Sequence, residues 1–224
     1  MHSLRQFGPN IWTVEQPSNF LGVPLGLRMT IIRLANQQLV IHSMSPCDAE
    51  THAAIQALGE VRYLIAPNLE HTRFIGEWIN DYPEATLYAP TDELLAKHPT
   101  AKNSNTLPFQ HDEELLCQPI NGMPRLQECA FFHAESQSLI LTDLAFNLGG
   151  GMSLWGKCFL GLNGAYNRFT PTRILKSLIK DQHPFCDSIQ TVAQWNFKQI
   201  IIAHGTPITQ DARSVFDKAF AWAL

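Results

Sequence analysis

The chain has 224 residues, a hydrophobic content of 45% and a formal net charge of -4 at pH 7. This length and composition are sufficient to bury a large core, and we expect a single domain over residues 1–224. A chain with this charge lacks the concentrated positive field that non-specific nucleic-acid binding requires, so nucleic acid is excluded as an expected partner.

Five cysteines lie far apart in the chain, with no CxxC pair and an odd total. This spacing argues against a disulfide framework and against a thiolate zinc site, and it favours a reducing cytoplasmic location. The sequence shows neither the apolar core of a signal peptide nor an apolar stretch long enough for a membrane span. We therefore expect a cytoplasmic protein.

Three short β-rich runs open the chain, and strands and helices then alternate. The next segment offers Ser45 or Asp48 as an N-cap, apolar positions on one face and Gly59 as a stop, which predicts a helix. The apolar run Val61–Ile65 then ends at Ala66–Pro67, where the chain enters a loop. The other elements expected in this half are strands at 10–15, 28–34, 38–42 and 85–88, and helices at about 72–81 and 91–97.

The second half repeats this order of elements, with strands expected at 115–119, 129–133, 138–142 and 199–203. Because strands precede helices in each half, we expect an α/β protein with two sheets face to face and helices outside. The segment 149–169 is apolar, aromatic and rich in glycine. It is too rich in glycine for a strong helix and too apolar for a solvated loop, so we expect it to pack over the site or in a homodimer contact.

Polar side chains follow three of the predicted buried strands. Asn68, Glu70 and His71 come after one strand, Asp143 after LILT, and His204 after IIIA. Residues beyond the carboxyl ends of such strands converge at the mouth of a sheet. Two imidazoles and two carboxylates could together bind one divalent ion, with zinc, manganese and ferrous iron about equally suited. The alternative is a cluster held by imidazole–carboxylate hydrogen bonds without a metal.

The same segments resemble the metallo-β-lactamase superfamily. Its hallmarks are an HxHxDH loop after a strand, a distant third histidine, an aspartate at a strand end and a late histidine before glycine. Here IAPNLEHTRFIG resembles the first element, LILTDLAFN the aspartate strand and IIIAHGTPI the last histidine strand. RMTIIRL and FFH bring the resemblance closer still to a family of bacterial proteins in that superfamily. The resemblance covers the chain from about Asn10 onwards and implies a four-layer αββα sandwich.

Departures from the superfamily pattern imply that at most one metal site remains. Ala66 and Asn68 stand where the first two histidines would be, and no histidine occurs at 124–128, where the third is expected. The first metal site of the superfamily uses these three histidines and should be absent. The second site corresponds here to four residues that can still bind a metal, with a glutamate in place of the loop aspartate: Glu70, His71, Asp143 and His204.

Two further residues are candidates for a catalytic role. His42 ends the strand QQLVIHSM, where superfamily members commonly carry an aspartate that orients a metal-binding histidine. It could be a ligand, a proton carrier or a partner for Glu70 or Asp143, and the alternative is a buried, hydrogen-bonded histidine. Asn68 could contact the substrate, and the alternative is that it caps the next helix or braces the loop.

Two functions from different classes fit these residues. One is a mononuclear metal-dependent hydrolase acting on an ester-like or phosphoester-like bond of a small molecule. The other is a non-catalytic binding module that keeps the fold and uses the apolar, glycine-rich segment as its contact surface.

Overall fold

The computed structural model describes residues 4–109, 111 and 113–224. The strands of this part of the chain are β1 (Arg5–Gly8), β2 (Ile11–Gln16), β3 (Asn19–Phe20), β4 (Val23–Pro24), β5 (Leu27–Arg33), β6 (Gln38–His42), β7 (Glu60–Ile65), β8 (Thr86–Ala89), β9 (Asn103–Thr106), β10 (Leu115–Pro119), β11 (Cys129–His133), β12 (Ser138–Leu141), β13 (Phe146–Leu148), β14 (Arg168–Thr170) and β15 (Gln199–Ile202). The first sheet has the order β1-β2-β5-β6-β7-β8-β9, and the second has the order β10-β11-β12-β15.

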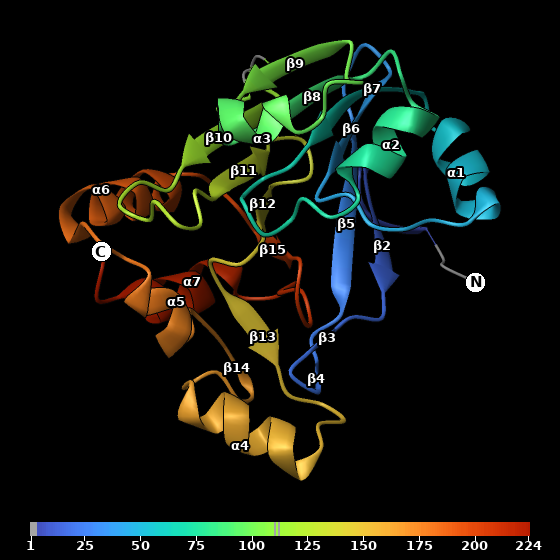
Figure 1. Cartoon of the computed structure of the whole chain (residues 1–224). Coiled ribbons are helices and arrows are strands. Elements are labelled where there is room, and N and C mark those ends of the chain that lie inside the picture. The colour runs from blue at the N-terminus through green and yellow to red at the C-terminus, as the bar shows by residue number, and fades with distance from the viewer. Residues whose placement is uncertain (1–3, 110, 112) are drawn as a thin grey trace.

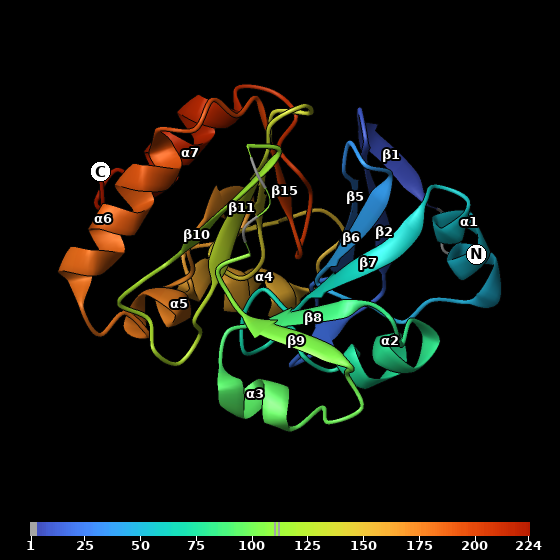
Figure 2. The same cartoon turned by 90° about the horizontal axis from the view of Figure 1, so that it is seen from above.

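Helices cover the outer faces of both sheets (Figures 1 and 2). They are α1 (Ala49–Gln56), α2 (Ile75–Asp81), α3 (Asp92–Ala96), α4 (Leu154–Leu162), α5 (Arg173–Ser177), α6 (Gln182–Ala193) and α7 (Ala212–Phe220). In Figure 2, α6 and α7 lie outside the second sheet, and α1 and α2 lie outside the first. The molecule is therefore the predicted four-layer αββα sandwich.

Three apolar clusters fill the spaces between the four layers. Trp78 of α2 packs with Ile31 and Leu64 on the outer face of the first sheet. Phe131 and Ile140 of the second sheet meet Ile65 and other residues of the first between the two sheets. A third cluster joins the second sheet to α6 and α7. Successive residues of a strand point to opposite faces of its sheet, so neighbours such as Ile31 and Ile32 belong to different clusters.

Parallel pairing brings together the strand ends that were expected to carry the site. In the first sheet β6 pairs in parallel with β7, so that His42 lies opposite Ile65. In the second sheet β12 pairs in parallel with β15, so that Leu141 lies opposite Ile202. The loops that follow these four strands therefore start at the same edge of their sheets.

The glycine-rich segment contains a helix that the sequence did not predict. Ser153 caps α4 by accepting a hydrogen bond from Gly156 N at 3.1 Å. Most glycines of the segment lie before or after the helix, and only Gly156 and Gly161 fall within it. The expectation that glycine would exclude a strong helix is therefore corrected. Leu160 of α4 packs against Val23 of the β3-β4 hairpin.

None of the helices described here is both long enough and apolar enough to cross a membrane.

Candidate metal centre

Three predicted ligands meet at one edge of the sandwich. The Nε2 atom of His71 lies 3.2 Å from Oδ2 of Asp143, and Nε2 of His204 lies 3.2 Å from Oδ1 of the same carboxylate. The ligand atoms of these three residues all lie within 4.8 Å of one another. The two imidazole ring centres are 5.2 Å apart. The loops after β7, β12 and β15 thus deliver two imidazoles and a carboxylate to a common point.

The other nitrogen of each imidazole is held by a hydrogen bond. Nδ1 of His204 donates to the backbone carbonyl of Gly26 at 2.6 Å. Nδ1 of His71 lies 2.6 Å from the hydroxyl of Ser43, which directly follows β6. Metal-binding histidines are usually oriented in this way, by a partner on the nitrogen that does not face the ion. Phe146 stacks on the His204 ring at 5.5 Å and further restricts its orientation.

Asn68 braces the loop that carries His71. Its Oδ1 accepts hydrogen bonds from the backbone N–H groups of Glu70 and His71, at 3.0 and 2.8 Å. Its Nδ2 donates to Oδ2 of Asp143 at 2.8 Å. The side chain is fully buried. Asn68 therefore braces the loop. It does not cap the next helix, because α2 begins only after Phe74.

A buried glutamate, Glu128, supports the other side of Asp143. Its two carboxylate oxygens accept hydrogen bonds from Thr142 N and Asp143 N, both at 2.8 Å. Its Oε2 also lies 3.4 Å from Nδ2 of Asn68. Glu128 therefore fixes the backbone at the point where β12 gives way to the loop with Asp143.

Burial and charge act in opposite directions on the groups at this site. Burial alone would raise the pKa of Asp143, but the neighbouring His71 and His204 hold it well below its ordinary value. Burial lowers the pKa of His71, and the charge of Asp143 outweighs this effect and raises it. Burial and the charge of Asp143 together raise the pKa of Glu128 to about 7. The site therefore favours an ionised Asp143 beside a cation.

The two remaining predicted residues lie outside the cluster of ligand atoms. Glu70 is exposed and lines the cavity beside the cluster. His42 is 1% exposed and lies edge-on to Phe131, with ring centres 4.9 Å apart. Its Nε2 has no hydrogen-bond partner among the described residues, and burial together with His71 lowers its pKa to about 3. His42 is therefore a neutral imidazole.

Sequence reasoning missed Glu128 and Ser43. Glu128 lies at the end of the segment in which the third histidine was sought, and its only sequence signal is a charged residue directly before a buried strand. Ser43 gives no signal beyond its position after β6. Both act through hydrogen bonds to groups from distant segments.

A cavity of about 580 Å³ opens over the three ligands. His71, Asp143 and His204 lie in its wall, and most of the remaining wall is apolar, including Phe146 and Phe159. Neither His42 nor Asn68 lines it. The cavity therefore presents a polar floor, formed by the three candidate metal ligands, under apolar walls.

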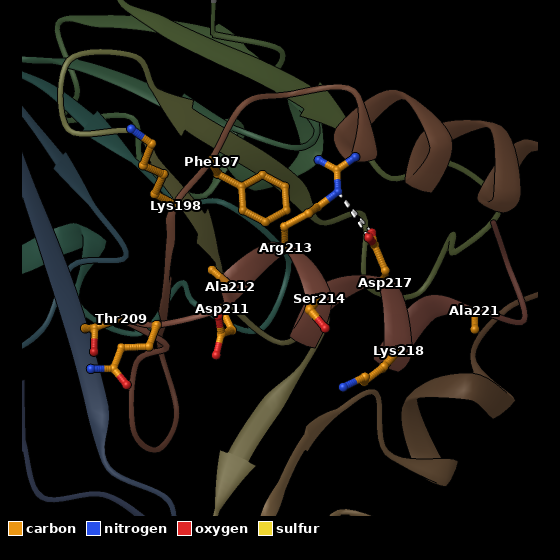
Figure 3. A pocket seen from close by; sticks show the side chains of 11 residues that line it. Phe197, Lys198, Thr209, Asp211, Ala212, Arg213, Ser214, Asp217, Lys218 and Ala221 are labelled. Atoms are coloured by element: carbon orange, nitrogen blue, oxygen red, sulfur yellow. Dashed lines mark hydrogen bonds and ion pairs between the residues drawn. The ribbon is translucent and has the colours of Figure 1, made fainter.

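A second hollow, about 810 Å³, runs along α7 (Figure 3). Arg213 and Asp217 form an ion pair there at 3.1 Å, and the hollow contains none of the three ligands. A dashed line in Figure 3 joins Arg213 to Asp217, so this cation is already paired. We therefore place the candidate site in the cavity over His71, Asp143 and His204.

Solved structures with this fold define the class to which the protein belongs. A metallo-β-lactamase from Pontibacter korlensis is similar with a TM-score of 0.65 and 10% identity, over 100% of this chain and 99% of that chain. The metallo-β-lactamase FIM-1 from Pseudomonas aeruginosa, in its mono-zinc form, is similar with a TM-score of 0.61 and 13% identity, over 99% and 94% of the two chains. The flavodiiron core of Flv1 from Synechocystis sp. PCC6803 has a TM-score of 0.65 and 11% identity, with 99% of this chain and 60% of that chain covered. The protein has the metallo-β-lactamase fold.

Within that class, the family is defined by a sequence model. The model of DUF4336, described as a domain of unknown function, matches residues 9–150. The chain belongs to this family. No curated protein matches the sequence.

Proposed function

We propose that the protein binds one divalent metal ion between His71, Asp143 and His204 and acts as a metal-dependent hydrolase. The observation that carries this proposal is the hydrogen bond from His204 Nδ1 to the Gly26 carbonyl. Since the carbonyl only accepts, a neutral His204 turns the lone pair of Nε2 towards Asp143 Oδ1 at 3.2 Å. Two acceptors facing each other require a cation between them, either a metal ion or a proton.

The spacing of the three ligands fits an ion. Ligand atoms about 2.1 Å from a common ion lie roughly 3.0–3.4 Å apart when they are neighbours in a tetrahedral or octahedral arrangement. Nε2 of His71 lies 3.2 Å from Oδ2 of Asp143, and Nε2 of His204 lies 3.2 Å from Oδ1, so each imidazole–carboxylate distance falls in this range. The ligand atoms of all three residues lie within 4.8 Å of one another. Two imidazoles and a carboxylate suit zinc, manganese or ferrous iron. A single ion is supported by the absence of the three histidines expected at the other site, and FIM-1 is a protein of this fold in a mono-zinc form.

Each residue of the site has a defined part in this proposal. A bound ion supplies a water ligand of lowered pKa and a positive charge that stabilises developing negative charge. His71, Asp143 and His204 hold the ion, Ser43 and Gly26 orient the imidazoles, and Asn68 orients Asp143. Glu70 lies in the cavity wall outside the cluster, so its side chain would have to move to complete the ligand set, or it would carry a proton from where it stands. His42 does not line the cavity, and nothing in the structure brings it to the substrate. A direct catalytic role for His42 therefore stays a prediction.

The cavity walls indicate the kind of substrate. Phe146, Phe159, Leu160 and Leu175 lie around the space above the ligands. Apolar walls bind apolar groups because removing both surfaces from water is favourable. We infer a small-molecule substrate that carries an ester-like or phosphoester-like bond on an apolar group.

Reloading chelator-stripped protein tests the proposal. After addition of zinc, manganese or ferrous iron, the protein should hydrolyse p-nitrophenyl esters or bis(p-nitrophenyl) phosphate, with longer acyl chains favoured among the esters. Asp143→Asn should lose this activity. Asp187→Asn, which breaks the exposed His183–Asp187 pair, is the matched control and should keep it. Absence of hydrolysis with every metal, on every one of these substrates, would exclude the hydrolase assignment.

A non-catalytic binding module is the second candidate, and one observation favours it. Both oxygens of Asp143 already have partners in His71, His204 and Asn68, so a proton on an imidazole can replace the ion. In that case the melting temperature should not change when zinc is added to chelator-treated protein. A rise that depends on zinc concentration would favour the metal site, because a ligand of the native state stabilises it.

A further inference from the structure

Exposed apolar side chains gather at one end of the molecule. Of the eight large hydrophobic residues that are exposed in the described part of the chain, six belong to α4, α5 and the β3-β4 hairpin. In Figure 1, α4 and the hairpin meet at the bottom of the molecule and α5 lies above α4. The indole N–H of Trp155 donates to the backbone carbonyl of Leu21 at 3.0 Å and joins the two elements. We call the six residues the apolar rim: Phe20, Leu21, Leu154, Trp155, Leu162 and Ile174.

The outward face of α4 has the wrong polarity for a solvated helix. Leu154, Cys158 and Leu162 follow one another at intervals of four residues, so they share one face, and all three are exposed. Leu154 is 85% exposed and Leu162 is 67% exposed. The opposite face is already buried through Leu160. An amphipathic surface helix normally turns charged or polar side chains outward, and α4 exposes an apolar stripe in their place.

Cations and no anions accompany the rim. The sequence from Leu144 to Lys180 contains five Lys or Arg residues and no Asp or Glu, although the whole chain has a net charge of -4. Two of the cations come close to Gly164, just after the end of α4. A Cβ atom placed on Gly164 would lie 3.4 Å from Arg168 Nη2 and 3.9 Å from Arg173 Nε. Both arginines and Lys157 are exposed. In the part of the chain that the structure describes, none of the three forms an ion pair with a carboxylate.

A second copy of the chain fits this surface poorly. A symmetric dimer would place each rim against the same rim of its partner. The exposed cations would then oppose one another with no carboxylate between them, which is unfavourable. A surface that is apolar at its centre and cationic at its edge, with no carboxylate in residues 144–180, is complementary to lipids that combine apolar chains with anionic head groups.

We propose that the apolar rim docks on an anionic lipid surface. The rim leucines and Trp155 enter the boundary between head groups and acyl chains, while Lys157, Arg168 and Arg173 pair with lipid phosphates. Phe20 and Ile174 belong to the rim and also line the cavity over the metal ligands. Docking therefore places the cavity mouth against the lipid, where an amphiphilic molecule can enter without crossing water. The docking itself does not depend on a bound metal.

Co-sedimentation with vesicles tests this proposal. The full chain should sediment with phosphatidylcholine vesicles that contain half phosphatidylglycerol, and much less with pure phosphatidylcholine. The Leu154→Ser/Leu162→Ser variant should lower the partition coefficient at least tenfold, since exposed leucines leave the core unchanged. Arg168→Gln/Arg173→Gln should lower it at least tenfold, because each cation near an anionic surface contributes roughly a fivefold change. Should the arginine double variant misfold, Lys157→Gln repeats the charge test and should lower the partition coefficient roughly fivefold. The Lys157 side chain makes no hydrogen bond in the described part of the chain, so its loss leaves the fold unchanged.

Matched controls change the same residue types elsewhere. Leu224→Ser and Lys218→Gln remove an exposed leucine and an exposed lysine far along the chain and should bind vesicles as the wild type does. No binding to anionic vesicles at low ionic strength would overturn the proposal. So would binding that the rim variants leave unchanged. A wild-type dimer that the leucine variant converts to a monomer, with no vesicle binding, would instead identify the rim as an interface between copies.

Discussion

Two sides of the site share the carboxylate of Asp143 but stabilise it in different ways. On one side, Asn68 and Glu128 are buried and direct their polar atoms to backbone N–H groups and to each other. On the other side, Nδ1 of His71 and of His204 is held by Ser43 and by the Gly26 carbonyl, and Nε2 of each faces Asp143 at 3.2 Å. The first side is closed by hydrogen bonds, whereas the second still requires a cation.

This difference explains how a metallo-β-lactamase fold can lose ligands and remain ordered. The resemblance places Ala66 and Asn68 at two of the missing histidines, and both residues are fully buried. A buried polar group without a partner is costly, so a lost ligand must be replaced by an apolar or a hydrogen-bonded residue. Ala66 is the first solution and Asn68 is the second. We therefore expect substitutions on the Asn68–Glu128 side to change stability and substitutions on the histidine side to change metal binding.

The largest stability effect is expected from Glu128→Ala. This change leaves the N–H groups of Thr142 and Asp143 without their acceptor in a buried position, and each such loss costs roughly 1–3 kcal/mol. We expect the free energy of unfolding to fall by about 4 kcal/mol in urea denaturation. Glu77→Ala, an exposed position on α2, is the control and should change it by less than about 0.5 kcal/mol. A tolerant Glu128→Ala would mean that the first side is not held by these hydrogen bonds.

The pH dependence of stability should also report Glu128. Its pKa is raised to about 7 in the folded state, so the folded state binds a proton that the unfolded state has already released above its ordinary value of 4.5. Stability should therefore fall as the pH rises from 4.5 to 7, by roughly 3 kcal/mol in the metal-free protein. Glu128→Gln should remove this component. Parallel pH profiles for wild type and variant would contradict a raised pKa.

Asn68→Ala should have a smaller effect on stability and a second effect on metal binding. The variant loses the acceptor for His71 N and the donor to Asp143, which we expect to lower the free energy of unfolding by about 2 kcal/mol. Because Asn68 orients Asp143, zinc affinity should fall roughly 10- to 100-fold in a chelator competition assay. Asn80→Ala on the exposed side of α2 is the control. Unchanged zinc affinity would separate Asn68 from the metal site.

The smallest effect is expected from Ser43→Ala. Ser43 contacts His71 only through Nδ1, so its removal loosens the ring without removing a ligand. Zinc affinity should fall roughly tenfold, while the free energy of unfolding should change by no more than about 1 kcal/mol. Ser177→Ala on exposed α5 serves as the control. If the free energy of unfolding fell by more than the binding free energy of zinc, both in kcal/mol, Ser43 would act mainly on stability, as Asn68 and Glu128 do.

Much of the fold follows from local patterns in the sequence. The runs ending at Ile65, Leu141 and Ile202 are apolar strands of the two sheets, and the residues after them were expected to meet at one edge of the sandwich. The Asp48 cap of α1 was also predictable, because a side-chain oxygen before an apolar period is a local signal. The predicted ligands His71, Asp143 and His204 come together for the same reason.

The remainder depends on contacts between distant segments. Glu128 acts on the backbone of Thr142 and Asp143, and no local pattern indicates that pairing. The helix predicted from about residue 72 begins at Ile75, after a loop whose start is held by hydrogen bonds to Asn68 from a distant part of the site. Helix α4 forms despite glycine because its buried face packs on the β3-β4 hairpin, and such tertiary contacts outweigh helix propensity.

The central claim is that one metal site remains, on the histidine side alone. The most direct test is elemental analysis of protein purified without chelator, for the wild type and for His204→Ala. We expect one equivalent of metal in the wild type and none in the variant, with unchanged circular dichroism. His183→Ala, which changes an exposed histidine on α6, should retain the metal. Two equivalents in the wild type, or one equivalent retained by His204→Ala, would contradict it.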